Sequence, residues 1–337
     1  MKTLFGRTES GRPVDLYTIE NDRLKVSIMN FGAIVVSIVD KRTGIDILKG
    51  YDTFAGYRND PHHMGGFIGR TANRIRNAQF MLDTNTYHIT ANENGITNLH
   101  GGNGFDRQIY GVEEYPDCLR FSRISPDGEE GFPGNMTVSI TYYLHGSVLR
   151  MEAEAVSDQD TLFAFTNHNY YNLDRSDSIL SHTLQIHADA YAPNDEWNIA
   201  RSDLKPVAGT PFDFREPKEI GRDIHREDGQ LQMCRGYDHY FAIGGSGLRE
   251  MAVCRGQKLQ MIVRSDLSGM HVYTGNVLNG IGKNGETNSP HSAICFEPEY
   301  QPNAINEKTV EPKPILKAGQ KRRNRIEIQL DTIPESA

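Results

Sequence analysis

The chain has 337 residues, of which 37% are hydrophobic, so it is long enough to bury a sizeable core without disulfide bonds or structural metals. Its 36 basic and 44 acidic residues are well mixed and give a net charge of −8, which argues against nucleic acid or an anionic membrane as the main partner. The one basic run, Lys321-Arg322-Arg323, precedes an expected strand and is interpreted as a solvated turn.

Several segments alternate apolar and polar residues with a period of two, which is typical of strands with one buried face. In chain order they span residues 24–28, 136–142, 149–155, 184–188 and 326–330. The turn residues His145-Gly146-Ser147 predict that the second and third of these segments form a hairpin. No segment has the pattern of an amphipathic helix longer than about three turns.

These elements predict an all-β fold, namely a large antiparallel β-sandwich with long loops. No internal repeat or linker marks a boundary, so residues 1–337 are expected to form a single domain. Neither a signal peptide nor an apolar stretch of about 18 residues is found, so no membrane association is expected. The four cysteines have no metal-binding or redox spacing, and we expect reduced thiols in a cytoplasmic protein.

Five segments combine histidine, acidic and amide side chains with glycine or proline, as binding loops on a rigid sandwich often do. The first, residues 69–75, contains Arg70, Asn73 and Arg74, which could bind sugar hydroxyls through charge-assisted hydrogen bonds. A structural arginine is the simpler interpretation of this segment alone. In the second, two glycines follow His100 and let the backbone pass close to a ligand, although a turn with a satisfied histidine explains them equally well.

The third segment places His168 between two asparagines within an apolar stretch. Buried polar groups need partners, so a hydrogen-bonded network is expected around a histidine that can exchange protons near neutral pH. In the fourth, Asp238 could accept hydrogen bonds from sugar hydroxyls, although a turn aspartate is the more ordinary interpretation. In the fifth, Glu297 and Glu299 are two residues apart, so an extended strand places both on one face. Either glutamate could be a base, and the residues alone do not choose between them.

In this order along nearly the whole chain, the segments resemble the aldose 1-epimerase (galactose mutarotase) family. The motifs that carry the resemblance are Gly-Arg-Thr-Ala-Asn-Arg-Ile (69–75), Leu-His-Gly-Gly (99–102), Gly-Phe-Pro-Gly (131–134), Thr-Asn-His-Asn-Tyr (166–170), Gly-Thr-Pro-Phe-Asp-Phe (209–214), Tyr-Asp-His (237–239) and Tyr-Thr-Gly-Asn (273–276). Each motif is modest alone, but the ordered set is specific. The resemblance implies the galactose mutarotase-like supersandwich and an isomerase that interconverts the α and β anomers of aldohexoses such as galactose and glucose.

The resemblance also implies roles for individual residues. Glu297 matches the family's catalytic base and His168 its catalytic acid, which together open and close the sugar ring without a metal or cofactor. His100 matches the second active-site histidine, and the positions that bind sugar hydroxyls are matched by Asn73, Arg74 and Asp238. A monosaccharide is therefore the expected partner. The protein itself is expected to be a monomer or a homodimer.

Two departures from the family pattern bear on this interpretation. Glu299 stands where the family often has glutamine, and an ionised carboxylate close to Glu297 would raise the pKa of the base. Residues 199–206, which follow Trp197, lack the family's proline and glycine, so a different loop is expected that could change the sugar preference if it borders the site.

Other functions are compatible with the same segments. A non-catalytic sugar-binding module could share the fold, and the enzyme could act on a different sugar or a disaccharide. A glycoside hydrolase or lyase is disfavoured, because a hydrolase needs carboxylates on both sides of the scissile bond and the two glutamates lie on one strand. We expect no metal site, and the pair His62-His63 is interpreted as a solvated turn rather than as ligands.

Overall fold

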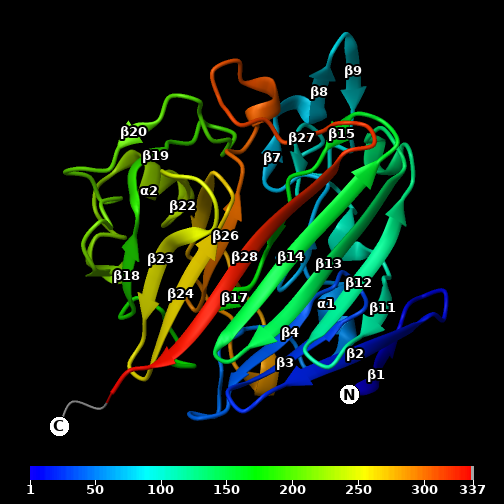
Figure 1. Cartoon of the computed structure of the whole chain (residues 1–337). Coiled ribbons are helices and arrows are strands. Elements are labelled where there is room, and N and C mark those ends of the chain that lie inside the picture. The colour runs from blue at the N-terminus through cyan, green and yellow to red at the C-terminus, as the bar shows by residue number, and fades with distance from the viewer. Residues whose placement is uncertain (335–337) are drawn as a thin grey trace.

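The computed structural model describes residues 1–334, and these residues form an almost entirely antiparallel β structure (Figure 1). The α-helices in this range are short: α1 (Phe54–Arg58) and α2 (Gly229–Cys234). Single 3-10 turns occur at Arg76–Ala78, Phe105–Arg107, Glu129–Gly131, Ile220–Arg222, Lys283–Gly285 and Ala304–Asn306. No helix within the described residues is long and apolar enough to cross a membrane. The predicted all-β sandwich is confirmed.

Three sheets make up most of the molecule. The N-terminal sheet has the order β1 (Lys2–Arg7), β2 (Pro13–Glu20), β3 (Leu24–Met29), β4 (Val35–Asp40) and β5 (Ile45–Asp46). The largest sheet has the order β11 (Gly111–Glu114), β12 (Cys118–Ser125), β13 (Met136–His145), β14 (Val148–Ser157), β28 (Lys321–Thr332), β24 (Leu259–Ser265), β23 (Arg249–Arg255), β18 (Thr183–Ile186) and β21 (Lys218–Glu219).

We call the third sheet the site-bearing sheet, because two of the candidate site residues, Asp238 and Glu297, lie on its strands. Its order is β17 (Tyr170–Tyr171), β26 (Ile294–Glu299), β25 (Gly269–Tyr273), β22 (Asp238–Ile243), β19 (Ala188–Ala192) and β20 (Lys205–Pro206). Short two-stranded ladders join the loops: β7 (Arg74–Ile75) with β10 (Asn98–Leu99), β6 (Phe67–Ile68) with β16 (Thr166–Asn167), β8 (Gln79–Leu82) with β9 (Asn85–His88), and β15 (Thr161–Leu162) with β27 (Ile315–Leu316).

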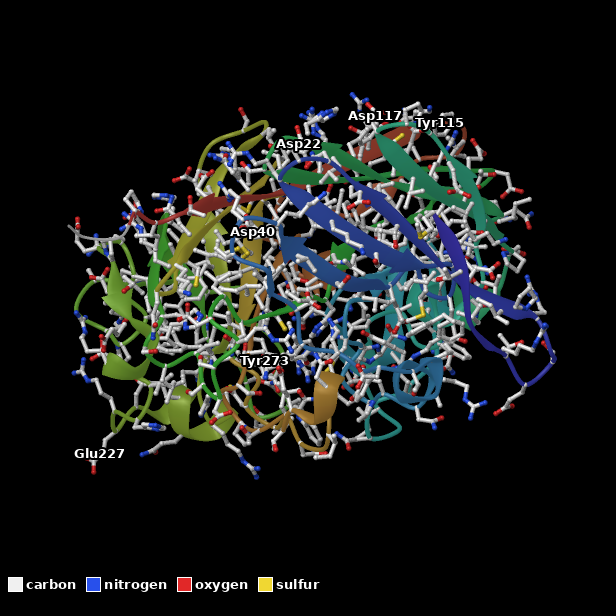
Figure 2. The ribbon with its side chains drawn as sticks, turned by 90° about the horizontal axis from the view of Figure 1, so that it is seen from below. Asp22, Asp40, Tyr115, Asp117, Glu227 and Tyr273 are labelled. Carbon is white, nitrogen blue, oxygen red and sulfur yellow. The ribbon has the colours of Figure 1, made fainter. Side chains whose placement is uncertain are left out.

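The inward faces of all three sheets contribute to one hydrophobic core. Val26 of β3, Phe121 of β12, Met151 of β14 and Phe296 of β26 all belong to it and are at most 1% exposed. The alternation in the sequence explains this packing, because every second residue of β14 is buried. Seen from below, the blue N-terminal strands lie against the large sheet, with the buried Asp40 inside the layers and Glu227 at the surface (Figure 2).

The strand predictions are confirmed with two corrections. The expected hairpin is β13–β14, closed at the His145–Val148 pair. Residues 184–188 do not form one strand: the chain leaves the large sheet after Ile186 and enters the site-bearing sheet at Ala188. The basic run at Lys321 is not a turn but the beginning of β28. Its basic side chains form ion pairs with glutamates of the neighbouring strand β14. Because these partners are distant in sequence, the basic run alone did not indicate a strand.

Candidate active site

A pocket of about 400 Å³ opens at one end of the site-bearing sheet. It brings together all six residues that the sequence nominated, although they span more than two hundred positions: Asn73, Arg74, His100, His168, Asp238 and Glu297. Strands supply two of them, since Asp238 begins β22 and Glu297 lies on β26. The others lie on or beside the short ladders, at β7, after β10, and between β16 and β17. Rigid strands thus position Asp238 and Glu297, and tight turns position the rest.

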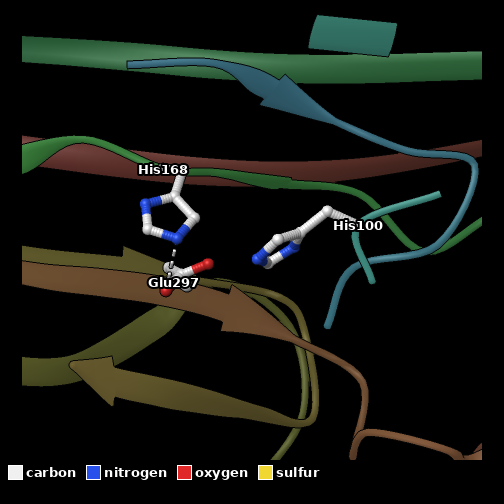
Figure 3. Close-up of side chains that lie close together, drawn as sticks. All are labelled: His100, His168 and Glu297. Carbon is white, nitrogen blue, oxygen red and sulfur yellow. Dashed lines mark ion pairs between the residues drawn. The ribbon is translucent and has the colours of Figure 1, made fainter. Parts of the chain in front are cut away.

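The proposed acid and base face each other at the bottom of this pocket. The Nε2 atom of His168 lies 3.6 Å from Oε1 of Glu297 (Figure 3), and the two residues are 5% and 2% exposed. The second oxygen of Glu297, Oε2, has no hydrogen-bond partner among residues 1–334. A buried carboxylate oxygen without a partner is costly unless a ligand satisfies it, so this atom marks the point where a substrate group would bind.

Burial pushes both members of the pair toward their neutral forms. Desolvation raises the pKa of Glu297 well above its ordinary value, the charge of Asp238 adds to the effect, and Arg74 opposes it. Desolvation also lowers the pKa of His168 to about 3, with a contribution from neighbouring His63. The charged forms of the pair are therefore held high in free energy, which favours proton exchange with a bound substrate.

Asp238 is a fixed anion on the opposite wall. Its Oδ1 accepts a hydrogen bond of 2.6 Å from Nε2 of His271, and its Oδ2 accepts one of 2.8 Å from the Asn198 amide. Burial alone would raise the pKa of Asp238, but these bonds, His271 and Arg74 hold it well below the ordinary value. Arg74 in turn donates two hydrogen bonds of 2.8 Å to Glu93, which fixes the plane of its guanidinium group.

Asn73 holds its neighbours in place. Its backbone N–H donates to Nδ1 of His100 at 3.2 Å, and its amide nitrogen lies 3.3 Å from Nδ1 of His271 and 3.4 Å from Oε1 of Glu299. Both Asn73 and His100 have positive φ angles, 57° and 55°, and they face each other at one end of the β7–β10 ladder, so the backbone there is tightly constrained. The amide is therefore largely occupied by protein contacts.

The two neighbouring glutamates differ in their surroundings. Glu297 lines the pocket, whereas Glu299 is fully buried behind Asn73 and His271. Desolvation raises the pKa of Glu299 well above its ordinary value, and Glu297 adds to this shift. Burial thus favours the neutral form of this carboxyl group over the ionised form that would raise the pKa of Glu297.

His100, His168 and Glu297 are close enough to be considered as metal ligands, since one atom from each lies within 4.8 Å of the others. The tautomer of His100 argues against this use. Because Nδ1 of His100 accepts the Asn73 N–H, a neutral His100 carries its proton on Nε2, which is then a donor and not a ligand. The donor set fits hydrogen bonding to hydroxyl groups better than it fits a cation.

The structure also places residues here that the sequence did not nominate. His271 lies opposite Glu297 in the β25–β26 ladder, and its alternation with the recognised Tyr273 is the signal that could have revealed it. The His62-His63 pair is not a solvated turn, as had been expected: both rings line the pocket, and Nδ1 of His63 lies 2.7 Å from Oδ2 of the buried Asp106.

The altered loop near Trp197 reaches the site through the residues on either side of the tryptophan. Glu196 and Asn198 line the pocket, and Asn198 contacts Asp238 directly. None of residues 199–206 lines the pocket, and the segment ends in β20. The segment that departs from the family pattern therefore begins directly after Asn198, which lines the pocket.

Arg70, which shares a motif with Asn73 and Arg74, points away from the pocket. It is 2% exposed and donates to the hydroxyl groups of Ser125 and Thr161 and to the backbone carbonyls of Ser125, Pro126, Pro133 and Gly134. The interpretation as a structural arginine is confirmed for Arg70.

Comparison with known proteins identifies the family of the chain. The sequence pattern of the family described as aldose 1-epimerase matches residues 15–329. The chain is 36% identical to galactose mutarotase of Homo sapiens over 335 residues, covering 95% of each protein, and 35% identical to aldose 1-epimerase of Haemophilus influenzae over 307 residues, covering 88% of the chain and 89% of the relative.

Solved structures agree. An aldose epimerase homologue from C. elegans superimposes with a TM-score of 0.88 at 26% identity, covering 95% of this chain and 100% of the other. Galactose 1-epimerase from Lactobacillus acidophilus gives a TM-score of 0.87 at 26% identity, with 98% of each chain covered. Because the family match spans nearly the full length and the site residues converge on one pocket, the chain belongs to the aldose 1-epimerase family.

Proposed function

We propose that the protein catalyses the interconversion of the α and β anomers of an aldohexose such as galactose or glucose. The observation that carries this proposal is the buried pair Glu297–His168, whose atoms are 3.6 Å apart at the bottom of a pocket lined with hydroxyl-binding groups. The names of the relatives, galactose mutarotase and aldose 1-epimerase, support the same reaction.

In the proposed reaction, the Glu297 carboxylate removes the proton of the anomeric hydroxyl while the bond between C1 and the ring oxygen breaks. The ring oxygen takes a proton from the imidazolium form of His168, which gives the open-chain aldehyde and a neutral alcohol. The ionised pair that reacts holds the same number of protons as the neutral pair that burial favours, so it forms when the carboxyl proton of Glu297 passes to His168. Rotation about the C1–C2 bond presents the other face of the aldehyde. Closure reverses both proton transfers, so the pair returns to its initial state without a cofactor.

The remaining residues hold the sugar during this rotation. Asp238 is the anionic acceptor for one or two hydroxyl groups, while Arg74 and the Nε2–H of His100 are donors. Asn73 keeps His100 in its donor tautomer, so its role is partly to position the donor. Pockets of this size bind small ligands, and a monosaccharide is the substrate that we propose.

We further propose that the chain is a single domain that works as a monomer or homodimer in the cytoplasm. The support for this location is that all four cysteines are free thiols, which suits a reducing compartment.

Polarimetry on freshly dissolved α-galactose and α-glucose tests the function. The protein should accelerate the approach to the equilibrium rotation, and it should do so equally after treatment with a chelator. The matched control is Glu297→Gln, which should bind the sugar without accelerating the change. If the wild-type protein binds both sugars by calorimetry and leaves the rate at that of buffer, it is a binding module and the proposal is wrong.

A further inference from the structure

His63 lies on a loop that is tied to the catalytic acid. The backbone N–H of Gly65 donates to the carbonyl of His168 at 2.9 Å, and the N–H of His168 donates to the carbonyl of Gly66 at 3.0 Å. The Asp60 carboxylate closes the loop by accepting from the N–H groups of His62 and Met64. His63 is thus held in a fixed position relative to the acid.

The backbone of His63 is also unusual. Its φ angle is 56°, in the left-handed region that few residues with a side chain adopt. Such a conformation persists only when the surroundings impose it, and it is enriched at ligand sites. Here it directs the imidazole into the pocket, where its ring lies edge-on to that of His100 with centroids 5.0 Å apart.

The hydrogen-bond polarity of His63 is set by Asp106. Nδ1 of His63 lies 2.7 Å from Oδ2 of Asp106. Burial alone would raise the pKa of Asp106, but its contact with His63 and the charge of Arg107 hold it below the ordinary value, so the carboxylate is an acceptor. The proton of a neutral His63 therefore sits on Nδ1, and its Nε2 is left as an acceptor that makes no hydrogen bond to residues 1–334.

His100 has the opposite polarity. Its Nδ1 accepts the Asn73 N–H, and burial lowers its pKa well below the ordinary value, so the ring is neutral with the proton on Nε2. The ring points toward Glu297 and His168 (Figure 3). Two adjacent imidazoles thus offer the pocket one acceptor and one donor, each fixed by a separate protein contact.

A sugar hydroxyl is the complement of this arrangement, because a single O–H group donates one hydrogen bond and accepts others. We propose that His63 is a substrate-binding residue and that one hydroxyl of the sugar donates to its Nε2 while accepting from Nε2–H of His100. The assignment rests on the proposed function, since it takes the occupant of the pocket to be a sugar. It gives His63 and Asp106 a part in sugar selection.

Equilibrium binding to deoxy sugars tests the contact. Calorimetry would measure the dissociation constants of galactose and of its monodeoxy analogues lacking the hydroxyl at carbon two, three, four or six. For the contacted hydroxyl, we expect its removal to weaken binding to the wild-type protein about 3- to 10-fold, the usual worth of one hydrogen bond. In His63→Phe, galactose should bind weaker by a similar factor, and removal of that hydroxyl should cost nothing further.

The matched variant His63→Gln keeps a side-chain acceptor and should restore part of the affinity and of the discrimination. Thermal unfolding of both variants identifies any loss of fold, and His63→Ala, which also lacks the acceptor, replaces His63→Phe if that variant does not fold. If every deoxy sugar shows the same penalty in wild type, His63→Phe and His63→Gln, then His63 contacts no hydroxyl and the inference is wrong. Polarimetry of the wild-type protein is scored separately, because loss of epimerase activity with intact discrimination contradicts only the proposed function.

Discussion

Two buried residues with ionisable side chains, Arg70 and Glu297, lie in contrasting environments. The guanidinium group of Arg70 donates to two hydroxyl side chains and to four backbone carbonyls, at distances between 2.7 and 3.3 Å. Glu297 is equally buried, yet its Oε2 has no partner among the described residues, and its Oε1 lies 3.6 Å from Nε2 of His168.

The difference separates a structural charge from a functional one. A fully bonded buried ion fixes the loops around it, and no bond remains for a ligand. A buried carboxyl group with an unbonded oxygen raises the free energy of the empty protein, and a substrate that supplies the missing hydrogen bond lowers it again. The contrast predicts that changes at Glu297 affect turnover and changes at Arg70 affect stability.

The largest expected effect is on turnover in Glu297→Gln. The amide keeps the size of the side chain but cannot remove the anomeric proton, so kcat should fall about 10²–10⁴-fold. Galactose should still bind, because the hydroxyl-binding residues are unchanged. The matched control is Glu299→Gln, two residues along the same strand, which should retain most of the activity. Normal turnover in Glu297→Gln with an inactive Glu299→Gln would exchange the roles of the two glutamates.

His168→Asn should also reduce turnover more than binding. The asparagine can still hydrogen-bond, but it cannot deliver a proton to the ring oxygen, and we expect kcat to fall about 10²-fold or more with little change in KM. Steady-state polarimetry at several sugar concentrations separates the two constants. An effect confined to KM would assign His168 to binding and leave the acid unidentified.

Arg70→Ala should give the opposite result. Removing the guanidinium group leaves Ser125, Thr161 and several carbonyls without their donor, which typically costs about 3–5 kcal/mol of folding free energy. Urea unfolding measures this loss, and kcat of the folded fraction should stay near that of the wild type. A stable Arg70→Ala protein with greatly reduced kcat would show that the arginine serves the site.

The residue pattern predicts the strands and the two candidate glutamates, but it does not predict which glutamate is the base. Strands such as β14 were predictable because apolar and polar residues alternate along them, and the two glutamates could be nominated from their spacing. The preference for Glu297 came from resemblance alone, and the structure now supplies a physical reason, since only Glu297 lines the pocket.

The contacts that the sequence could not predict join distant residues through irregular loops. Asp106 lies 43 residues after His63, and His271 lies 33 residues after Asp238. The sequence around each of these histidines is that of an ordinary loop or strand. Only the fold brings it to a carboxylate, so neither pattern nor periodicity could identify the pair.

The smallest expected effect sharpens the comparison, because it concerns Glu299, a buried carboxyl group that is not fully bonded and does not line the pocket. The pKa of Glu299 is raised in the folded protein, so its stabilising contribution is complete below the ordinary glutamate pKa and is lost as the pH rises toward the folded value. Glu299→Gln keeps the shape and removes the ionisation. The variant should therefore be more stable than the wild type near pH 7, by about 1 kcal/mol, with a smaller gain near pH 4. Urea unfolding at both pH values checks this, and a variant that is less stable at pH 7 than at pH 4, relative to wild type, would mean that Glu299 is an ionised partner of His271.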